Sequence, residues 1–504
     1  MFKNLKNDIP ASIVVFFVAL PLCLGIALAS DAPPFSGLIA GIIGGIIVGA
    51  LSGSKIGVSG PAAGLAAIVA VAISQLGYQN FLVAVVLGGV IQIVFGILRF
   101  GIIGYYFPSA VIKGMLTGIG IIIILKEIPL FFGIEGKLSF FNLAEKFGTL
   151  HIGATVIGVI SLAILLFWSN ILAKKAKIFT IIQGPLIAVI VGIIYYVVTT
   201  GNATLSLTDK LLVSVPVPDS LDDFKAQFIT PNFSAITNID IWITGFTIAL
   251  VASLETLLCV EATDKIDPNK NVTPTNRELF AQGTGNIVSG LIGGLPITQV
   301  IVRSSANIQS GGRSKMSAII HGFLLLISVI AIPNLLNKIP LSVLAAILLI
   351  VGYKLAKPAL FVKMFKLGWK QFVPFILTVV GIVFIDLLKG IGIGVALALI
   401  IVFVLHRNFK NSSKVEKEGK KAKLKLSDDL IFFKKATILK TLNELEAGTH
   451  LEIDATSISY LDNDFIEIFE DFKDRAQEKD INITLITSNG SEENPTNFNS
   501  LITA

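Results

Sequence analysis

Apolar residues fill long runs along the chain as far as about residue 406, and polar residues gather in the stretches between them. Most of these runs approach the roughly 20 residues that an α-helix needs to cross the hydrocarbon core of a bilayer. The pattern therefore predicts an α-helical polytopic membrane protein with fourteen spans. We place them at about 9–29, 35–53, 61–76, 81–99, 102–125, 151–171, 178–199, 240–260, 276–293, 298–309, 315–333, 340–356, 372–387 and 389–406.

The third and tenth runs are too short to cross a bilayer, and each follows a break rich in glycine and proline. Residues 59–64 read SGPAAG, and residues 293–298 read GGLPIT. A helix can stop within a membrane only where protein or a water-filled cavity satisfies the freed backbone groups. Paired half-helices at corresponding positions point to the substrate site of an inverted-repeat transporter. The alternative is a pair of glycine-rich turns between ordinary spans.

Lysine and arginine segregate to one side of this topology. If the N-terminus is cytoplasmic, they gather in the connections that follow even-numbered spans, the richest of which holds Lys354, Lys357, Lys363, Lys366 and Lys370. The positive-inside rule places these connections in the cytoplasm. The loop on the opposite side, at about 200–239, separates the first seven spans from the last seven. Each half, about 9–199 and 240–406, thus has seven spans, and an odd number gives the two repeats opposite orientations.

The N-terminus resembles a secretory signal, because Lys3 and Lys6 precede an apolar run. Residues 9–29 are nevertheless long enough for a full span, and many spans follow them. We therefore expect no cleavage, and a multi-pass protein of the inner (plasma) membrane with its N-terminus in the cytoplasm.

The composition changes after His406. Residues 407–423 form a basic linker, which marks the cytoplasmic face of the membrane. Residues 424–504 resemble a soluble domain in which strand-like stretches alternate with helical ones, including an amphipathic helix over 464–478. This order predicts a small cytoplasmic α/β domain behind a transmembrane domain of residues 1–406.

Composition agrees with a membrane protein, because the 504 residues are 53% hydrophobic and only 15% charged. Two cysteines, Cys23 and Cys259, give no disulfide framework, and the four histidines are scattered without metal-ligand spacing. There is no phosphate-binding loop, dinucleotide fingerprint or nucleophile elbow. We expect neither an enzyme nor an ATP-driven pump, and no metal, cofactor or nucleic acid.

Glu255 lies within the apolar run of the eighth span. Inserting an acidic residue at the centre of a membrane helix costs about 2.5–3.5 kcal/mol, so the side chain must face a cavity, find a partner or stay protonated. Such a carboxyl group is suited to carry protons or to couple transport to an ion. The alternative is a structural glutamate that is hydrogen-bonded to the backbone of a neighbouring span.

Arg303 lies near the start of the second half-helix, where the helix dipole is also positive. Its guanidinium, the hydroxyls of Ser304 and Ser305 and the local backbone N–H groups together make a candidate anion site. The first half-helix offers a second N-terminus at residues 61–64, where small residues let an ion reach the backbone. The alternative is a structural ion pair between Arg303 and Glu255.

Three segments resemble the SulP (sulfate permease) family of anion transporters with a C-terminal STAS domain. They are VSGPAAG over 58–64, SLETLL over 253–258 and VRSSANIQSGGRS over 302–314, and the similarity extends over nearly the whole chain. The resemblance implies a seven-plus-seven inverted repeat with core and gate domains, and a dimer. It implies a small inorganic anion held between the third and tenth spans, with help from the first and eighth.

On this resemblance the predicted substrate-binding residues lie in three short stretches. They are Leu22 and Cys23, then Gly60, Pro61, Ala62 and Ala63, then Ile301, Val302, Arg303 and Ser304. The ion-coupling residues would be Glu255 and Cys259. VALPLCL over 18–24 resembles the bicarbonate-transporting branch, whereas Arg303 matches the sulfate and chloride transporters.

Glu255 matches the carboxylate of proton-coupled members, and the sulfur of Cys259 is a poor ligand for sodium. Proton coupling is therefore favoured and sodium coupling stays possible. The STAS-like segment has no hydroxyl at 462–464, where related signalling domains are phosphorylated, so it is expected to aid assembly, trafficking or regulation.

These features leave three alternatives to a proton-coupled carrier of bicarbonate or sulfate. The first is a sodium-coupled bicarbonate or dicarboxylate carrier. The second is a nucleobase permease, which would have no STAS domain and no Arg303. The third is a sensor or scaffold whose membrane part anchors residues 424–504. The expected partners are the anion, membrane lipid and a second copy of the chain.

Overall fold

The computed structural model supports a helical membrane protein followed by a small α/β region. It describes residues 4–101, 108–134, 148–176, 179, 183–217, 221–269, 271–385, 387–405, 414–418, 421–426, 429–430, 435–443, 445–456, 458, 460–461, 463–488, 490–495 and 498. The predicted linker residues 407–413 and the STAS position Asp462 lie outside these residues. The chain divides into two compact units, residues 1–101 with 116–357 and residues 102–115 with 358–504, and each is described by itself.

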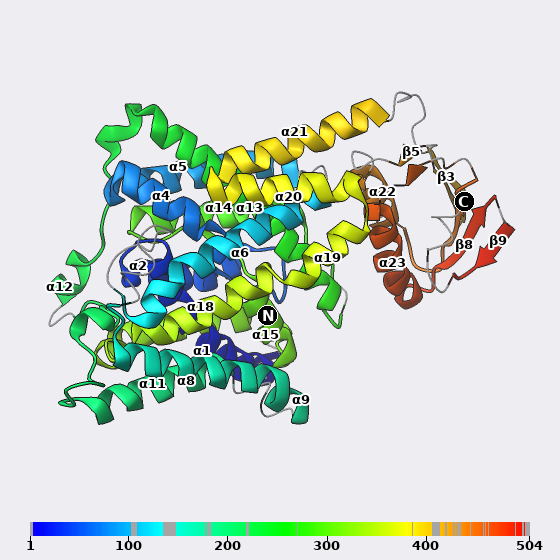
Figure 1. The fold of residues 1–504 in the computed structure, drawn as a ribbon. Coiled ribbons are helices and arrows are strands. Elements are labelled where there is room, and N and C mark those ends of the chain that lie inside the picture. The colour runs from blue at the N-terminus through cyan, green and yellow to red at the C-terminus, as the bar shows by residue number, and fades with distance from the viewer. Residues whose placement is uncertain are drawn as a thin grey trace. The chain divides into compact units, whose positions relative to one another are not determined.

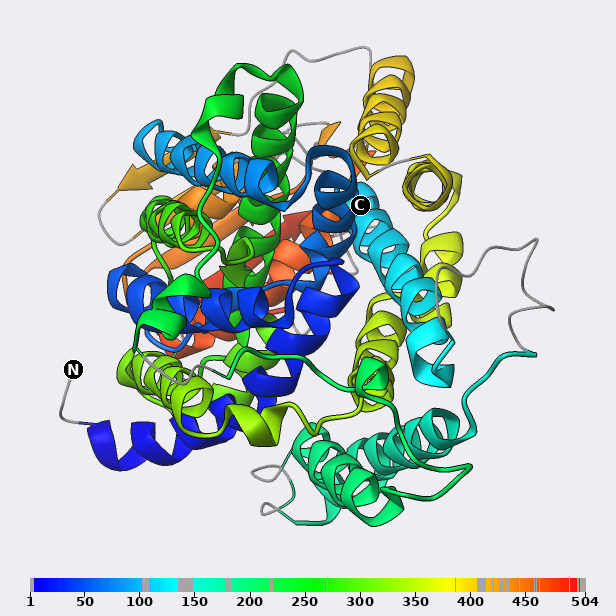
Figure 2. The same ribbon diagram turned by 90° about the vertical axis from the view of Figure 1, so that its left-hand side faces the viewer.

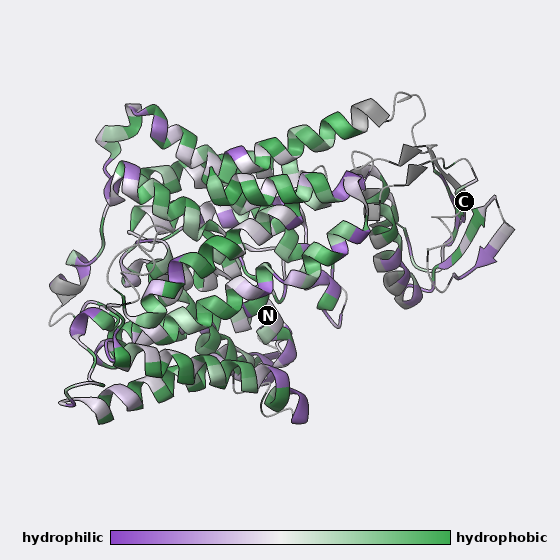
Figure 3. Cartoon of the chain, in the orientation of Figure 1, coloured by the Kyte–Doolittle hydropathy of each residue, from purple (hydrophilic) through white to green (hydrophobic). Residues whose placement is uncertain are grey.

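The first seven apolar segments end at residue 199. They are α1 (Leu5–Ala29), α2 with η2 and α3 (Pro34–Ile43, Gly44–Val48 and Gly49–Leu51), η3 with α4 (Ala63–Leu65 and Ala66–Leu76), α5 (Tyr78–Ile97), α6 (Ser109–Phe132), α8 with η5 and α9 (Ile152–Phe167, Trp168–Leu172 and Ala173–Lys175) and α11 (Gly184–Thr199). Their apolar residues are green in Figure 3. The helices α8 and α11 lie side by side in Figures 1 and 2.

The second seven segments begin at residue 239. They are α13 (Ile239–Ile266), α14 (Thr275–Leu291), α15 (Ile301–Gln309), α16 (Met316–Ala331), α18 (Leu341–Leu355), α20 (Trp369–Phe384) and α21 (Leu387–Leu405). Short helices η6 (Asp209–Leu211), α12 (Leu221–Ala226), η7 (Phe233–Thr237), α17 (Pro333–Leu336) and α19 (Pro358–Lys366) lie between them. The described residues thus confirm the predicted fold of fourteen segments in two halves, and α4 and α15 are the short ones among them.

The two breaks pair with each other across the two halves. β1 (Ser59–Pro61) and β2 (Ile297–Gln299) form a two-stranded antiparallel sheet in which Gly60 is opposite Thr298. η3 and α4 continue from the first strand, and α15 continues from the second after Val300. An antiparallel pair is the arrangement expected of two breaks in oppositely oriented repeats.

The long connection between the two halves is bound to a second connection, the one between α17 and α18. The N–H of Val213 donates to the carbonyl of Ile339 at 2.9 Å. The backbone of Val215 exchanges two hydrogen bonds with the Asn337 side chain, at 2.6 Å and 2.9 Å. These contacts hold part of the 200–239 loop in a defined place.

The C-terminal region contains a five-stranded sheet of order β3-β4-β6-β8-β9. Its strands are β3 (Lys414–Glu418), β4 (Lys421–Lys425), β6 (His450–Asp454), β8 (Asn482–Thr487) and β9 (Gly490–Glu493), and β5 (Asp429–Leu430) pairs with β7 (Tyr460–Leu461) separately. β4, β6 and β8 are parallel, and β3 and β9 are antiparallel to their neighbours. The sheet therefore begins within the charged run that the sequence analysis treated as linker.

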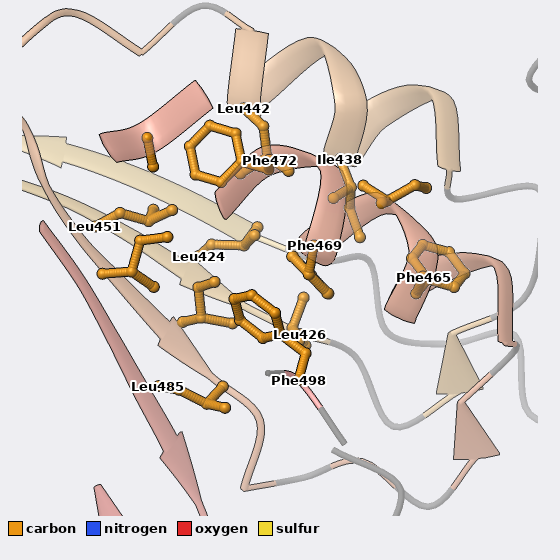
Figure 4. Close-up of a cluster of buried hydrophobic side chains, with 14 of the residues drawn as sticks. Leu424, Leu426, Ile438, Leu442, Leu451, Phe465, Phe469, Phe472, Leu485 and Phe498 are labelled. Carbon is orange, nitrogen blue, oxygen red and sulfur yellow. The ribbon is translucent and has the colours of Figure 1, made fainter. Parts of the chain in front are cut away.

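Two helices complete this region. They are α22 (Lys435–Asn443) and α23 (Asn463–Glu478). Their apolar side chains Ile438, Phe465 and Phe469 share one buried cluster with Leu424 and Leu451 of the sheet (Figure 4). A parallel sheet centre covered by helices is the small α/β architecture that the sequence predicted.

Candidate functional site

The paired breaks satisfy one another's backbone through hydrogen bonds between residues far apart in the sequence. The N–H of Val300 donates to the carbonyl of Val58 at 2.9 Å, and the N–H of Val58 donates to Ser304 Oγ at 3.0 Å. The freed polar groups of each break are therefore bonded within the protein, as a membrane environment requires.

α14 supports both strands with two side chains spaced one helical turn apart. Gln282 Nε2 donates to Ser59 Oγ at 2.7 Å, which holds β1. Asn286 bonds both backbone groups of Ile297, receiving its N–H at 2.5 Å and donating to its carbonyl at 3.1 Å. Asn286 also donates to Gln92 Oε1 at 2.6 Å. The side chains of this network are all buried, namely Ser59, Gln92, Gln282 and Asn286. Buried hydrogen bonds of this kind fix where both half-helices begin.

Arg303 is fully buried at the first turn of α15. Its Nη2 donates to Cys23 Sγ of α1 at 3.4 Å, while its Nε and Nη1 have no hydrogen-bond partner among the described residues. Gly60 of β1 lies directly against the guanidinium, because a Cβ added there would be 2.1 Å from Nη1. The fold therefore brings together Arg303, Cys23 and Gly60, which come from the three predicted substrate-binding stretches. A buried guanidinium that keeps two unpartnered nitrogen atoms is a candidate anion site with donors still available.

Glu255 and Cys259 lie one turn apart on α13 and reach the starts of the two half-helices. The backbone N–H of Gly64 donates to the Glu255 carboxylate, and its Oε2 has no hydrogen-bond partner among the described residues. The backbone N–H of Ile301 donates to Cys259 Sγ. The two side chains thus occupy the two helix N-termini. The alternative hypothesis of an Arg303–Glu255 ion pair is not supported, since neither group bonds the other.

The remaining predicted site residues differ in how far they face this centre. Leu22 of α1, Pro61 and Ala62 are buried, and so is Ser304, which bonds Val58. Ala63 and Ile301 are partly exposed, and Val302 is 38% exposed. The side chain of Val302 therefore points away from Arg303, and only its backbone belongs to the start of α15.

Two buried ionisable side chains that keep an unpartnered atom were not among the predicted site residues. His321 of α16 is fully buried with Nε2 unpartnered, and Glu127 of α6 is 1% exposed with Oε1 unpartnered, both among the described residues. Glu127 was missed because the predicted span ended at residue 125, whereas α6 continues to Phe132. An ionisable residue inside an apolar run was the available signal for both.

A separate cavity of about 310 Å³ lies beside the start of α2. Its lining includes Phe35, Tyr78, Pro216, Ile229 and Gly293. It contains none of the predicted site residues, so the polar centre around Arg303 remains the candidate site.

Comparison with known proteins gives consistent matches. Residues 5–378 match the sulfate permease family. The Bacillus subtilis protein YvdB, named as a candidate sulfate transporter, is 30% identical over 362 residues, which are 70% of this chain and 65% of YvdB. The bicarbonate transporter BicA of Picosynechococcus is 26% identical over 369 residues, or 70% of this chain and 62% of BicA. The chain thus spans less than two thirds of the length of these relatives.

Solved structures show the same fold. The transmembrane domain of a cyanobacterial bicarbonate transporter BicA has a TM-score of 0.67 and 24% identity, covering 77% of this chain and 98% of that domain. The murine anion transporter Slc26a9, in its inward-facing state, has a TM-score of 0.68 and 16% identity, covering 96% and 86% respectively. The second likeness extends over the C-terminal α/β region as well.

Proposed function

Because the chain belongs to the sulfate permease family, we propose that it is a secondary transporter of a small inorganic anion. This anion is either bicarbonate, written below as hydrogencarbonate, or sulfate. The observation that carries this proposal is the buried Arg303 with two unpartnered nitrogen atoms between two half-helix N-termini. A buried charge without a partner is costly, and a bound anion would supply the missing partner. The relatives named for bicarbonate and sulfate transport support the same substrate class.

Coupling to protons is the second part of the proposal. Glu255 would carry the proton, because its carboxylate contacts the first half-helix through Gly64 and keeps one oxygen unpartnered. Sodium is the less favoured coupling ion, since Cys259 offers sulfur where sodium prefers oxygen. A proton on Glu255 would lower the negative charge near the incoming anion and so link the two movements.

The transport cycle would move the half-helices past the rest of the membrane domain, as in an elevator. The two starts are bonded to each other and to α14, so they would travel as one body. The protein would act as a homodimer in the inner (plasma) membrane, with its N-terminus and STAS domain in the cytoplasm. The distribution of lysine and arginine supports this orientation.

Uptake into proteoliposomes tests this function. Radiolabelled hydrogencarbonate, sulfate and chloride would be offered with imposed proton or sodium gradients, to wild-type protein and to Arg303→Ala. We expect uptake of at least one anion by the wild type and its loss in the variant. Arg313→Ala is the matched control, because Arg313 is exposed and, among the described residues, it is bonded through its backbone N–H, which donates to Asp8. Equal uptake by Arg303→Ala would contradict the transport site and favour a membrane-anchored scaffold.

A further inference from the structure

His321 presents a hydrogen-bond acceptor inside the membrane region. Its Nδ1 lies 2.6 Å from the carbonyl oxygen of Ala318. A carbonyl can only accept, so Nδ1 carries the hydrogen, and the neutral ring then holds a lone pair on Nε2. That atom is buried and has no partner among the described residues. α16 thus carries one unused acceptor, and the hydrogen bond to Ala318 sets its tautomer.

Arg303 is the charged group that acts on this imidazole. The electrostatic influence of its guanidinium reaches His321. Gly41 of α2 links the two geometrically, because a Cβ there would meet Cys23 Sγ, Leu325 Cδ1 and Arg303 Nη1 within 4 Å. Leu325 follows His321 by one helical turn, so the two share a face of α16. That face therefore looks toward the guanidinium.

Among the described residues, the helices that pack most extensively against α16 carry titratable groups on α1 alone. α2, η2, α3 and α17 pack against α16 and contain none. α1 carries Lys6, which is exposed, Asp8, which accepts from the backbone of Arg313 and Ser314, and Cys23, which contacts Arg303. A second positive charge on the ring would be repelled by Arg303, so the neutral acceptor form is the one that an anion meets.

Donors and an acceptor within electrostatic range of one another are complementary to an anion that carries its own hydroxyl group. We propose that His321 is a specificity-determining residue that selects hydrogencarbonate, whose oxygen atoms accept from Arg303 while its O–H donates to Nε2. This inference rests on the proposed transport function and names its substrate. Sulfate and chloride have no hydrogen to donate, so they would leave the buried lone pair unsatisfied. A site built to bond a hydroxyl discriminates strongly against ligands that lack one.

The test compares His321→Asn with wild-type protein in proteoliposomes at a pH near 8. An asparagine amide can replace Nδ1 as the donor to Ala318, but it is too short to replace Nε2. We expect the wild type to take up hydrogencarbonate at least about tenfold faster than sulfate or chloride. The variant should lose about tenfold of its hydrogencarbonate uptake and keep its chloride uptake. His450→Asn, on an exposed residue of β6, is the matched control.

Three results would overturn the inference. They are equal losses of hydrogencarbonate and chloride uptake in His321→Asn, no loss of either, or a wild type that prefers sulfate or chloride. The last result would leave the proposed anion transport intact, whereas uptake of no anion by the wild type would contradict the proposed function itself. If His321→Asn does not fold, thermal stabilisation of the wild type decides: hydrogencarbonate should raise its Tm more than chloride or sulfate, and equal shifts would refute the selection.

Discussion

The two half-helices occupy equivalent places in the two halves of the chain, yet they bring different chemistry to the centre. The first, η3 with α4, has only small and apolar residues at its start, and the charge near it is Glu255 from α13. The second, α15, carries its own charge in Arg303. The repeat thus sets where the two helix ends meet, while the side chains place an acidic group at one end and a basic group at the other.

The supports of the two breaks differ in the same way. β1 is bonded to α14 through one side-chain hydrogen bond, from Gln282 to Ser59. β2 is bonded through both backbone groups of Ile297, which meet Asn286. The half-helix that bears the arginine is therefore held more firmly. Substitutions that act on one half-helix at a time test this difference between the two half-helices.

The largest effect is expected from Gly60→Ala, which changes the first break in order to disturb the second. The added Cβ would be 2.1 Å from Arg303 Nη1, so the guanidinium must move. Misplacing a binding group by about 1 Å can cost about a hundredfold in rate, and we expect anion uptake to fall by about that factor. Uptake into proteoliposomes measures it. Gly392→Ala in α21 is the control, since a Cβ there meets nothing within 4 Å; equal losses in both variants would contradict the prediction.

Glu255→Gln removes the charge associated with the first half-helix. With the carboxylate present, we expect uptake of chloride or sulfate, whose charge does not change in this range, to rise several-fold as the external pH falls from about 8 to about 6, because acid supplies the coupled proton. The glutamine variant should show a nearly flat pH profile. Glu261→Gln, six residues further along α13, is the control, because Glu261 is 39% exposed in its side chain and pairs with Lys265. A wild-type profile in Glu255→Gln would refute proton coupling through this residue.

Asn286→Ala and Gln282→Ala compare the two supports directly. Losing Asn286 leaves the N–H and carbonyl of Ile297 and the Gln92 oxygen without this partner, whereas losing Gln282 releases Ser59 Oγ and a bond to Glu278. A buried polar group left unsatisfied costs about 1–3 kcal/mol. Asn286→Ala should therefore lower the free energy of unfolding more than Gln282→Ala does. Thermal unfolding in detergent measures both, and the reverse order of Tm values would show that the comparison is wrong.

The smallest effect on selectivity is expected from deleting the C-terminal region, residues 414–504. Its sheet and buried cluster are built from its own strands and helices. Yield or rate should fall, while the ratio of uptake rates for any two anions should stay within about twofold of the wild type, because that ratio reflects the contacts at the binding site. A changed order of preferred anions would mean that this region takes part in substrate selection.

Sequence reasoning predicted the fold well because its main signals can be recognised within single stretches of the chain. Apolar run length defines the spans, which needs no knowledge of distant contacts. The breaks at 59–64 and 293–298 were recognisable for the same reason. The sequence could not show that Ser59 pairs with Gln299, since register depends on the packing of both halves.

The features that were not predicted depend on contacts in the folded protein rather than on the sequence pattern. His321 is an isolated histidine in an apolar helix, and only the structure places it within electrostatic range of Arg303. Residues 414–418 look like linker because they are charged, and their place at a sheet edge follows from pairing with β4. Side-chain direction and long-range pairing are three-dimensional properties, which local composition does not contain.

The shared hydrogen bonds of the two breaks have a consequence for biosynthesis. Val58 and Ser304, which bond each other, are 246 residues apart. During translation the first break must wait inside the membrane with unsatisfied backbone groups until the second half of the chain has been made. The N-terminal half on its own should therefore be a substrate for membrane quality control, and its half-life should lengthen when the C-terminal half is supplied as a separate chain.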